Sequence, residues 1–369
     1  MVMPAELLQV SYAAPIREYL LTQFGFIFVV TFGRLVFPEV EQEVVLLMGT
    51  KKEGKGLRLI ELKDDSDLDL IHKFRAPQVP VEDSSEKWTQ YFLNDAQRKV
   101  LRDALRSPNI RRLGEMASVD IGVVTGYNDF FILREDAVKQ LNAEEHTVPV
   151  VTRTKALSGI RFCKGDWREN RSNGLPTYLL TVNSLSGIPS LLRQYIKKGE
   201  KEGISKHFKC RIRDPWYVVP SVWVPHAFLF RQIGVFPKLI LNEMRATCTD
   251  TLHRVKFKNI GQSKAIAACF YNSLTFACAE IFGRSYGGGV LELMPTEAEK
   301  LPIPFVSSEP HELFFELDSL MRQGLVDEAL DLGDKRILRE TLGFSDEGIS
   351  IMRTAWRTLS DRRGARRAR

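Results

Sequence analysis

The sequence opens with the stretch MVMPAELLQVSYAAPIREYLLTQFGFIFVVTF, residues 1–32, and this stretch decides the fold class. Residues 1–4 and 26–31 are short apolar runs typical of strands, whereas residues 5–24 between them are typical of a helix. Strands without polar alternation are buried on both faces, as in a parallel sheet that helices cover on each side. The order strand, helix, strand therefore predicts an α/β domain.

Two further apolar runs, residues 42–48 and 57–62, continue this pattern. The connector from Gly49 to Gly56 is rich in glycine and lysine, so we expect it to form a hairpin loop between two paired strands. About four strands and one helix are too few for an independent doubly wound sheet. We therefore expect residues 1–75 to be the C-terminal part of a larger sheet domain whose other strands precede Met1.

The rest of the chain divides into three parts by composition. Residues 76–95 are polar and contain prolines, which predicts a linker; residues 96–305 mix strand-like and helical segments; residues 306–369 have helical periodicity. The expected strands are Ile121–Thr125, Phe130–Leu133, Tyr217–Val219 and Val222–Val224, and the expected helices are Asp95–Leu105, Ser184–Lys198 and Gln262–Phe282. Five arginines in the last eight residues predict a disordered basic tail that adds non-specific affinity for an anionic partner.

The composition excludes several classes of protein. With 44% hydrophobic and 27% charged residues, the 369-residue chain is not largely disordered. Its longest apolar run, residues 24–32, is far shorter than the ~20 residues that span a bilayer. Five cysteines without a Cys-x-x-Cys pair argue against a zinc site and a disulfide framework. We expect a cytoplasmic protein without membrane contact or metal, and the net charge of +6 permits an anionic partner.

Gly283-Arg-Ser285-Tyr-Gly287 matches the Gly-x-Ser-x-Gly pattern of hydrolase nucleophiles. That motif needs a strand before the serine and a helix after it. Here a helical segment precedes the motif and a strand-like run follows, and His311 is the histidine that lies downstream. The pattern therefore predicts a glycine-rich turn.

Two other motifs carry weak alternatives. Glu61-Leu-Lys63, with Glu39 upstream, faintly resembles a metal-dependent nuclease centre, which needs converging acidic oxygens. Asp214-Pro215-Trp216-Tyr217 lacks one proline of the Asp-Pro-Pro-aromatic motif of amino-methyltransferases, so it predicts an aromatic core anchor instead.

Basic and polar residues beside turns have the chemistry of nucleic-acid contacts. Lysine and arginine next to serine, asparagine or exposed glycine backbone suit phosphates, and tyrosine and asparagine on turns reach base edges. Taken singly, each such residue is more often a solvated charge or a turn residue. The candidate DNA contacts are Tyr127, Asn128, Arg153, Lys155, Arg245, Arg284, Ser285 and Tyr286.

Several segments, taken in order, resemble the C-terminal half of the gamma-class, adenine-specific DNA methyltransferases of the TaqI type. These segments are Met3–Leu8, Leu35–Pro38 with Val44–Leu47, Gly122–Phe131, Arg153–Gly159, Pro215–Tyr217, Asn272–Gly289 and Leu301–Pro304. The resemblance covers most of residues 1–305 and implies the end of a Rossmann-like methyltransferase sheet, then a mixed α+β target-recognition domain and a helical tail.

The same resemblance implies a target-recognition role on double-stranded DNA in a restriction-modification or related defence system. The Phe-x-Gly-x-Gly loop for S-adenosylmethionine and the catalytic Pro-Pro-Tyr/Phe motif are absent, and the chain contains no Pro-Pro dipeptide. We therefore assign no catalytic residue and expect S-adenosylmethionine and N6-adenine methylation only through a separate N-terminal methyltransferase subunit. The alternatives are a non-enzymatic, sequence-specific DNA-binding module and an inactive remnant of such an enzyme.

Overall fold

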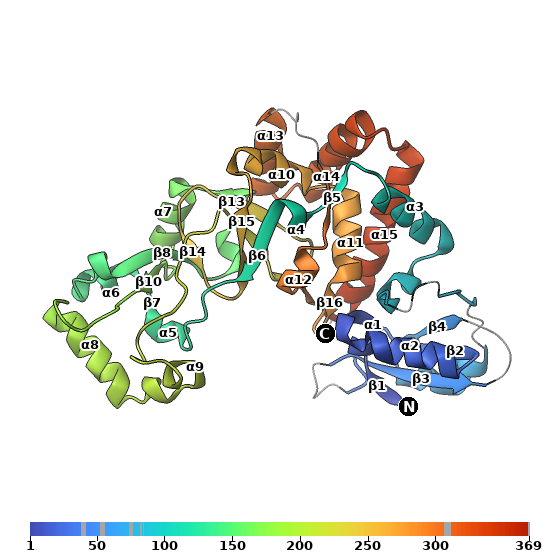
Figure 1. The fold of residues 1–369 in the computed structure, drawn as a ribbon, viewed down its shortest axis with the longest axis horizontal. Helices are drawn as coiled ribbons and strands as arrows, with labels where there is room; N and C mark the ends of the chain where they lie inside the picture. Colours follow the sequence, from blue (N-terminus) through green and yellow to red (C-terminus); the bar gives the residue numbers. More distant parts are fainter. Residues whose placement is uncertain are drawn as a thin grey trace.

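The computed structural model describes residues 1–37, 42–51, 56–73, 77–81, 83, 85–305 and 311–367, which form three lobes (Figure 1). The sheet lobe, residues 1–92, lies at the lower right of the view. The central lobe contains residues 93–122, 152–176, 223–246, 249–305 and 311–367, and the outer lobe contains residues 123–151 and 177–222 together with the strand at residues 247–248. Separate clusters of buried apolar side chains underlie these lobes, so the chain is a mixed α/β structure with several cores.

The sheet lobe is built on four strands in the order β1-β3-β2-β4, with bounds Val2–Pro4 (β1), Phe26–Phe32 (β2), Val44–Thr50 (β3) and Leu57–Leu62 (β4). β3 runs antiparallel to β1 and to β2, and β4 runs parallel to β2. The expected parallel sheet is thus wrong for two of the three strand pairs. The expected hairpin of β3 with β4 is also wrong, because β2, with Val29 and Val30 fully buried, is apolar on both faces and takes the central place between them.

The expected helix over residues 5–24 is interrupted. It consists of α1 (Glu6–Gln9), a 3₁₀ turn (Ser11–Ala13) and α2 (Ala14–Gln23). Pro15 lies in the first turn of α2, where its missing N–H costs nothing, but inside a longer helix it would clash with the preceding turn. A new helix, α2, therefore begins at Ala14, one residue before Pro15, and α1 does not continue through it.

Residues of the expected linker pack against the sheet lobe. Val79 exchanges backbone hydrogen bonds with Leu57 of β4, and Trp88 and Tyr91, in a 3₁₀ turn over Trp88–Phe92, are buried in the sheet-lobe core. A longer 3₁₀ segment, Asp65–Lys73, follows β4. The domain boundaries at residues 75, 95 and 305 themselves stay predictions.

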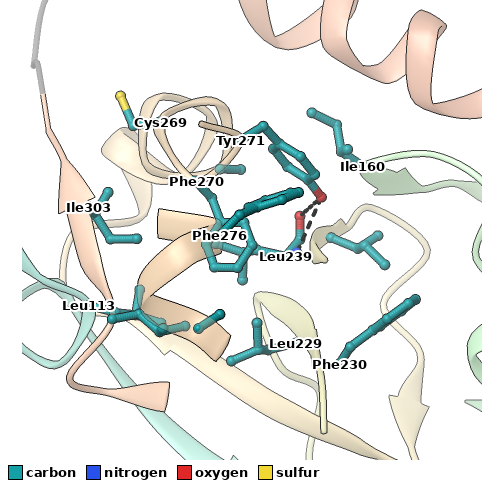
Figure 2. Close-up of a cluster of buried hydrophobic side chains, with 14 of the residues drawn as sticks. Leu113, Ile160, Leu229, Phe230, Leu239, Cys269, Phe270, Tyr271, Phe276 and Ile303 are labelled. Atoms are coloured by element: carbon teal, nitrogen blue, oxygen red, sulfur yellow. Dashed lines mark hydrogen bonds between the residues drawn. The ribbon is translucent and has the colours of Figure 1, made fainter. Parts of the chain in front are cut away.

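The central lobe has a five-stranded sheet in the order β6-β15-β11-β13-β9, with one core beneath it. Its bounds are Ala117–Ile121 (β6), Leu252–Phe257 (β15), Ala227–Phe230 (β11), Leu239–Asn242 (β13) and Arg161–Phe162 (β9). Figure 2 shows Phe270, Tyr271 and Phe276 packed toward these strands, and the Tyr271 hydroxyl bonds the backbone nitrogen and oxygen of Leu239 at 3.2 and 2.9 Å.

Helices from the last quarter of the chain complete this core, which confirms the expected helical character for residues 311–360; residues 306–310 lie outside the described residues. These helices are α13 (His311–Arg322), α14 (Val326–Gly333), a π-helical segment (Asp334–Thr341) and α15 (Asp346–Gly364), joined by α3 (Asp95–Leu105). Trp356 of α15 is buried edge-on against Phe276 of α11 (Ser273–Phe282). The expected single helix over residues 262–282 is instead α10 (Ser263–Cys269) and α11, because the Asn272 side chain caps α11 at the Thr275 N–H (2.9 Å).

The expected disordered arginine tail is wrong through Arg367, and residues 368 and 369 lie outside the described residues. α15 continues through Arg362 and Arg363, and a 3₁₀ turn covers Ala365–Arg367. Arg363 is paired with Glu280 and Arg366 with Glu43, and all four side chains are buried. Sequence-local charge counting misses these partners because they lie far away along the chain.

The outer lobe packs short elements around a small sheet of order β14-β8-β10-β7. Its elements are α5 (Asn128–Phe131), β7 (Ile132–Leu133), α6 (Glu135–Gln140), β8 (Thr147–Val151), β10 (Tyr178–Leu180), α8 (Ser190–Lys201), α9 (Phe208–Arg211) and β14 (Thr247–Cys248). The expected strands at 217–219 and 222–224 are absent, since Pro215, Pro220 and Pro225 interrupt the backbone donors that a strand needs. Trp216 instead packs on Phe130 and Phe131, which confirms the expected aromatic anchor.

The remaining α-helices and strands are short. They are β5 (Ile110–Arg112), α4 (Leu113–Met116), α7 (Lys164–Ser172), β12 (Gln232–Ile233), β16 (Arg284–Ser285), β17 (Leu291–Glu292), α12 (Pro295–Ala298) and β18 (Pro302–Pro304). Within the described residues, no single helix is long and apolar enough for a membrane span; Ile260–Cys269 and Ser273–Phe282 reach that length and composition together, with an 88° bend between them.

Candidate nucleic-acid interface

Tyr127 and Asn128 lie on an exposed, internally bonded turn at the start of the outer lobe. The Thr125 hydroxyl donates to the Asn128 side-chain oxygen at 2.6 Å and accepts from the Tyr127 N–H at 3.2 Å. Gly126 has a φ of +91°, a conformation that favours glycine. The turn therefore presents a tyrosine ring and an asparagine side chain to solvent from a fixed backbone.

Arg153 and Lys155 leave the strands at the same end as this turn. β8 runs parallel to β14, and Val123 forms a parallel bridge with Thr249, just after β14. Parallel neighbours end at the same edge, so residues that follow Val123 and residues that follow β8 emerge on one side. Arg153 and Lys155 are both exposed. The structure thus groups four of the eight sequence candidates.

Arg245 lies before β14 and so enters from the opposite end of that strand. Its backbone is left-handed, with a φ of +62°, which is rare for a residue with a Cβ. The Asn242 side chain holds this turn by donating to the carbonyls of Pro225 and Ala246, each at 2.7 Å. Arg245 is an exposed cation on a rigid, strained turn, apart from the group around Tyr127.

Arg284, Ser285 and Tyr286 lie where the sheet lobe meets the central lobe. Arg284 pairs with the buried Glu297 at 3.0 Å, and Lys87 pairs with the same carboxylate at 2.9 Å. Burial, followed by a hydrogen bond to Glu292, raises the pKa of Tyr286 to about 12.

Ser285 is hydrogen-bonded to residues on both sides of this junction, Gln9 of the sheet lobe and Arg366 of the central lobe. Its N–H donates to the Gln9 side chain, and its hydroxyl accepts from Arg366 at 3.1 Å. The charge of Arg284 is already satisfied, so the contacts of Arg284 and Ser285 give them a structural role; their contact with DNA stays a prediction.

The weak catalytic alternatives gain no support from the geometry. Ser285 ends β16 before a turn into β17, and α11 precedes it, which confirms the glycine-rich turn. Glu61 is paired with Arg362 at 2.9 Å, and the described part of the chain contains no group of three or more His, Cys, Asp or Glu that could hold a metal. Glu39 lies outside the described residues.

A mainly apolar cavity of about 220 Å³ lies between α3 and α11. We compared its lining residues with the groups that a bound S-adenosylmethionine would need. The acidic side chains that line it are already bonded: Glu86 accepts from Gln90 at 2.6 Å, and Glu297 holds Lys87 and Arg284. A nucleoside ligand needs free polar groups to fix its orientation. Neither carboxylate is therefore free to hold the ribose or the amino group of S-adenosylmethionine, and we place no cofactor there.

A group of cations, most of them exposed, lies outside the residues predicted from the sequence; we name it the basic strip and define it as residues 190–213. It carries eight lysines and arginines against two glutamates, a net charge of +6 that equals that of the whole chain. The strip adjoins the Tyr127 turn: Arg213 donates to the carbonyls of Val124 and Thr125, both at 2.6 Å, and the His207 ring centroid lies 4.7 Å from that of Tyr127. Counting charge in windows along the sequence would have found it.

Residues 85–338 match the family model of the C-terminal domain of the type II methyltransferase M.Eco57I. The chain belongs to this family. All eight sequence candidates and the basic strip lie inside the matched residues. The match confirms the resemblance at the level of a type II methyltransferase C-terminal region.

A curated relative and two solved structures are similar to this M.Eco57I-type domain. The type II methyltransferase M.AccI of Acinetobacter calcoaceticus is 25% identical over a 224-residue alignment that covers 58% of this chain and 39% of the relative. The chain thus spans about two-fifths of that relative's length. The type IIG restriction endonuclease BpuSI (TM-score 0.44, 13% identity) aligns with 99% of this chain and 47% of its own. The type IIL restriction-modification enzyme MmeI, solved in complex with DNA (TM-score 0.49, 10% identity), aligns with 98% and 49%.

Proposed function

We propose that this chain is the target-recognition region of a gamma-class, site-specific DNA adenine-N6 methyltransferase of a restriction-modification or related defence system. The observation that carries the proposal is the family match over residues 85–338, within which exposed polar and basic residues emerge together. Arg153 and Lys155 contact phosphates or guanine edges, and Tyr127 and Asn128 contact bases or the adjoining backbone. Arg245 supplies a separate cation from its rigid turn.

The chemistry of methyl transfer comes from polypeptide outside these 369 residues, either elsewhere in a longer chain or in a partner subunit. A cofactor loop and a Pro-Pro-Tyr/Phe motif are what the reaction requires, and the sequence has neither. The contribution of this region is to hold DNA in register so that the target adenine can be flipped into the catalytic site.

The sheet lobe is the part we assign to docking on the catalytic polypeptide. β1 and β2 run parallel to each other with β3 between them, and β1 lies at the edge of the described sheet. Val2 of β1 is 57% exposed. An unpaired strand edge is a template for a further strand, so this edge can extend into the rest of a methyltransferase sheet.

The deciding experiment is transfer of labelled methyl from S-adenosylmethionine to duplex DNA, by this chain alone and with a methylase half that carries both missing motifs. We expect activity in the mixture only. Activity of the chain alone would mean that it contains an undetected cofactor site. Inactivity of both samples with intact DNA binding would favour the binding module or the inactive remnant over the split enzyme.

A second experiment addresses the contacts. Arg153→Ala/Arg245→Ala should weaken DNA binding and flatten its salt dependence by up to about 1.8 in the slope of log K against log salt, since each lost phosphate contact removes about 0.9. A matched control is Lys99→Ala/Lys335→Ala, which removes two exposed cations of the central lobe. Equal binding by wild type and the Arg153/Arg245 variant would overturn this placement.

A further inference from the structure

We propose that the basic strip, residues 190–213, binds the phosphodiester backbone of duplex DNA beside the bases that the Tyr127 turn contacts. This inference rests on the proposed function and adds a second DNA-binding surface to it. In Figure 1, α8 and α9 lie at the lower left of the molecule, at the end of the outer lobe and next to α5, which begins at Asn128.

The cations of α8 form an ordered row. Arg193, Lys197 and Lys201 follow one another at four-residue spacing, so they share one face of the helix. All three are exposed, and the adjoining face, which includes Leu192 and Ile196, is buried in the outer lobe. Three charges in a row along one helix face match the regular spacing of phosphates along a DNA strand.

The row continues through the residues after α8. Lys206, Lys209 and Arg211 are all exposed. Across the described residues, Lys198 is the cation of the strip that has a carboxylate within 4.0 Å, namely Glu202 at 3.7 Å. Arg213 is engaged by the carbonyls of Val124 and Thr125. The exposed cations of the strip without a carboxylate are available to a polyanion, and DNA binding would release the counterions that surround the duplex.

The strip is held rigidly against the Tyr127 turn. The Tyr195 ring of α8 stacks on Phe130 of α5, with centroids 4.6 Å apart, and its hydroxyl donates to the Phe130 carbonyl at 2.8 Å. A Cβ on Gly199 would come within 2.5 Å of the Phe130 ring, so only glycine lets α8 pack this closely. A fixed geometry between backbone contacts and base contacts is what sets the register of a protein on DNA.

The surroundings of two exposed apolar side chains favour DNA over a membrane as the partner of the basic strip. Phe208 and Ile212 are 62% and 63% exposed, and Lys209 and Arg211 lie over the Phe208 ring. An interfacial membrane helix needs a continuous apolar face, whereas Leu192 and Ile196 of α8 are buried in the outer lobe. Side chains of this kind, flanked by cations, suit contact with sugars and base edges in a groove instead.

The test uses the full chain and the variant Arg193→Gln/Lys197→Gln/Lys201→Gln. The control Lys99→Gln/Arg106→Gln/Lys335→Gln removes the same charge from exposed positions of the central lobe. A third protein, Arg193→Lys/Lys197→Arg/Lys201→Arg, keeps the charges of the row. Duplex DNA affinity is measured by fluorescence anisotropy from 50 to 300 mM salt, after circular dichroism has shown equal folding.

We expect the first variant to bind duplex DNA on the order of 100-fold more weakly at 0.1 M salt, with a salt slope reduced by about 2.7, because three phosphate contacts are lost. The control should lose much less, and the charge-keeping variant should bind within a few-fold of wild type. Equal losses in the first variant and the control would show a general effect of net charge and overturn the inference.

Two further outcomes separate the possibilities. If wild type binds no duplex at all, the proposed function fails with the inference; if wild type binds and the strip variant binds equally well, the inference alone fails. Loss of binding to phosphatidylserine vesicles with unchanged DNA affinity would assign the strip to a membrane surface, and this too would overturn the inference.

Discussion

Removing Glu280 should destabilise the central lobe more than any surface substitution, because it leaves a buried arginine without its counter-charge. Glu280 of α11 and Arg363 of α15 are each 3% exposed. Two guanidinium nitrogens of Arg363 donate to the two carboxylate oxygens at 2.9 and 2.6 Å, and a third donates to the carbonyls of Gly234 and Gly289, both at 2.7 Å. The ion pair therefore holds the C-terminal end of α15 against α11.

The expected loss of stability follows from the burial of this ion pair. Breaking a buried pair by removing one partner costs about 3–5 kcal/mol, whereas replacing both partners by apolar residues of similar volume is often close to neutral. We therefore expect Glu280→Ala to cost about 3–5 kcal/mol, Glu280→Gln to cost less because it keeps an acceptor, and Glu280→Leu/Arg363→Met to cost far less than Glu280→Ala.

The assay is urea unfolding of these variants together with the single variants Glu280→Leu and Arg363→Met, which complete a double-mutant cycle, supported by hydrogen exchange of peptides from α11 and α15. The exchange data assign the transition to the central lobe, which matters because a chain with several cores need not unfold in one step. A cost below about 1 kcal/mol for Glu280→Ala, the range of an exposed ion pair, would refute the reasoning, since it would mean that water reaches Arg363.

Three further predictions concern other sites. Gly333→Ala should destabilise the protein by more than about 2 kcal/mol, because its Cβ would lie 1.9 Å from the Tyr271 carbonyl oxygen, whereas Gly364→Ala, with open space around it, should stabilise α15 by up to about 1 kcal/mol; thermal unfolding that ranks the two variants the other way would contradict this. Burial, with a smaller contribution from Arg322, lowers the pKa of Lys238 from 10.5 to about 8. Between these pH values the unfolded chain binds one proton more than the folded chain, so the contribution of Lys238 to the free energy of unfolding rises with pH, by up to about 1.4 kcal/mol per pH unit. Urea unfolding from pH 8 to 10.5 should show a weaker rise in Lys238→Met than in wild type, and identical slopes would count against this prediction. Arg284→Gln should change DNA affinity less than about twofold, because Glu297 already neutralises this charge, whereas Arg153→Gln should cost close to tenfold at 0.1 M salt; binding titrations that show the reverse order would restore Arg284 as a contact.

Local signals in the sequence predicted the elements whose causes are local. The helix Asp95–Leu105 occurs with the expected bounds because Asn94 and Gln97 form a capping box at its start. The strand Leu57–Leu62 also has its expected bounds. The strand order of the sheet lobe was not predictable in the same way, since the position of β2 between β3 and β4 depends on which strand buries both faces, a property of the assembled sheet.

Long-range ion pairs explain the largest error. The arginines of the C-terminal region look like a solvated tail in sequence, yet Arg363 finds Glu280, 83 positions away, and Arg366 finds Glu43. In the candidate interface, residue type and turn context selected Tyr127, Asn128, Arg153 and Lys155, which the structure leaves exposed on one side; their contact with DNA stays a prediction. The same signals also selected Arg284, whose buried acidic partner Glu297 cannot be recognised before the fold is known.

The pair of Glu43 and Arg366 imposes an order of events during translation. The Glu43 side chain is 5% exposed, the Arg366 side chain is fully buried against it at 2.6 Å, and 323 positions separate the two residues. The ribosome therefore synthesises the sheet lobe long before it synthesises Arg366, whose guanidinium pairs with the Glu43 carboxylate. A nascent chain that has not yet reached Arg366 therefore carries Glu43 without this partner, and the sheet lobe gains the contact only after α15 has been made.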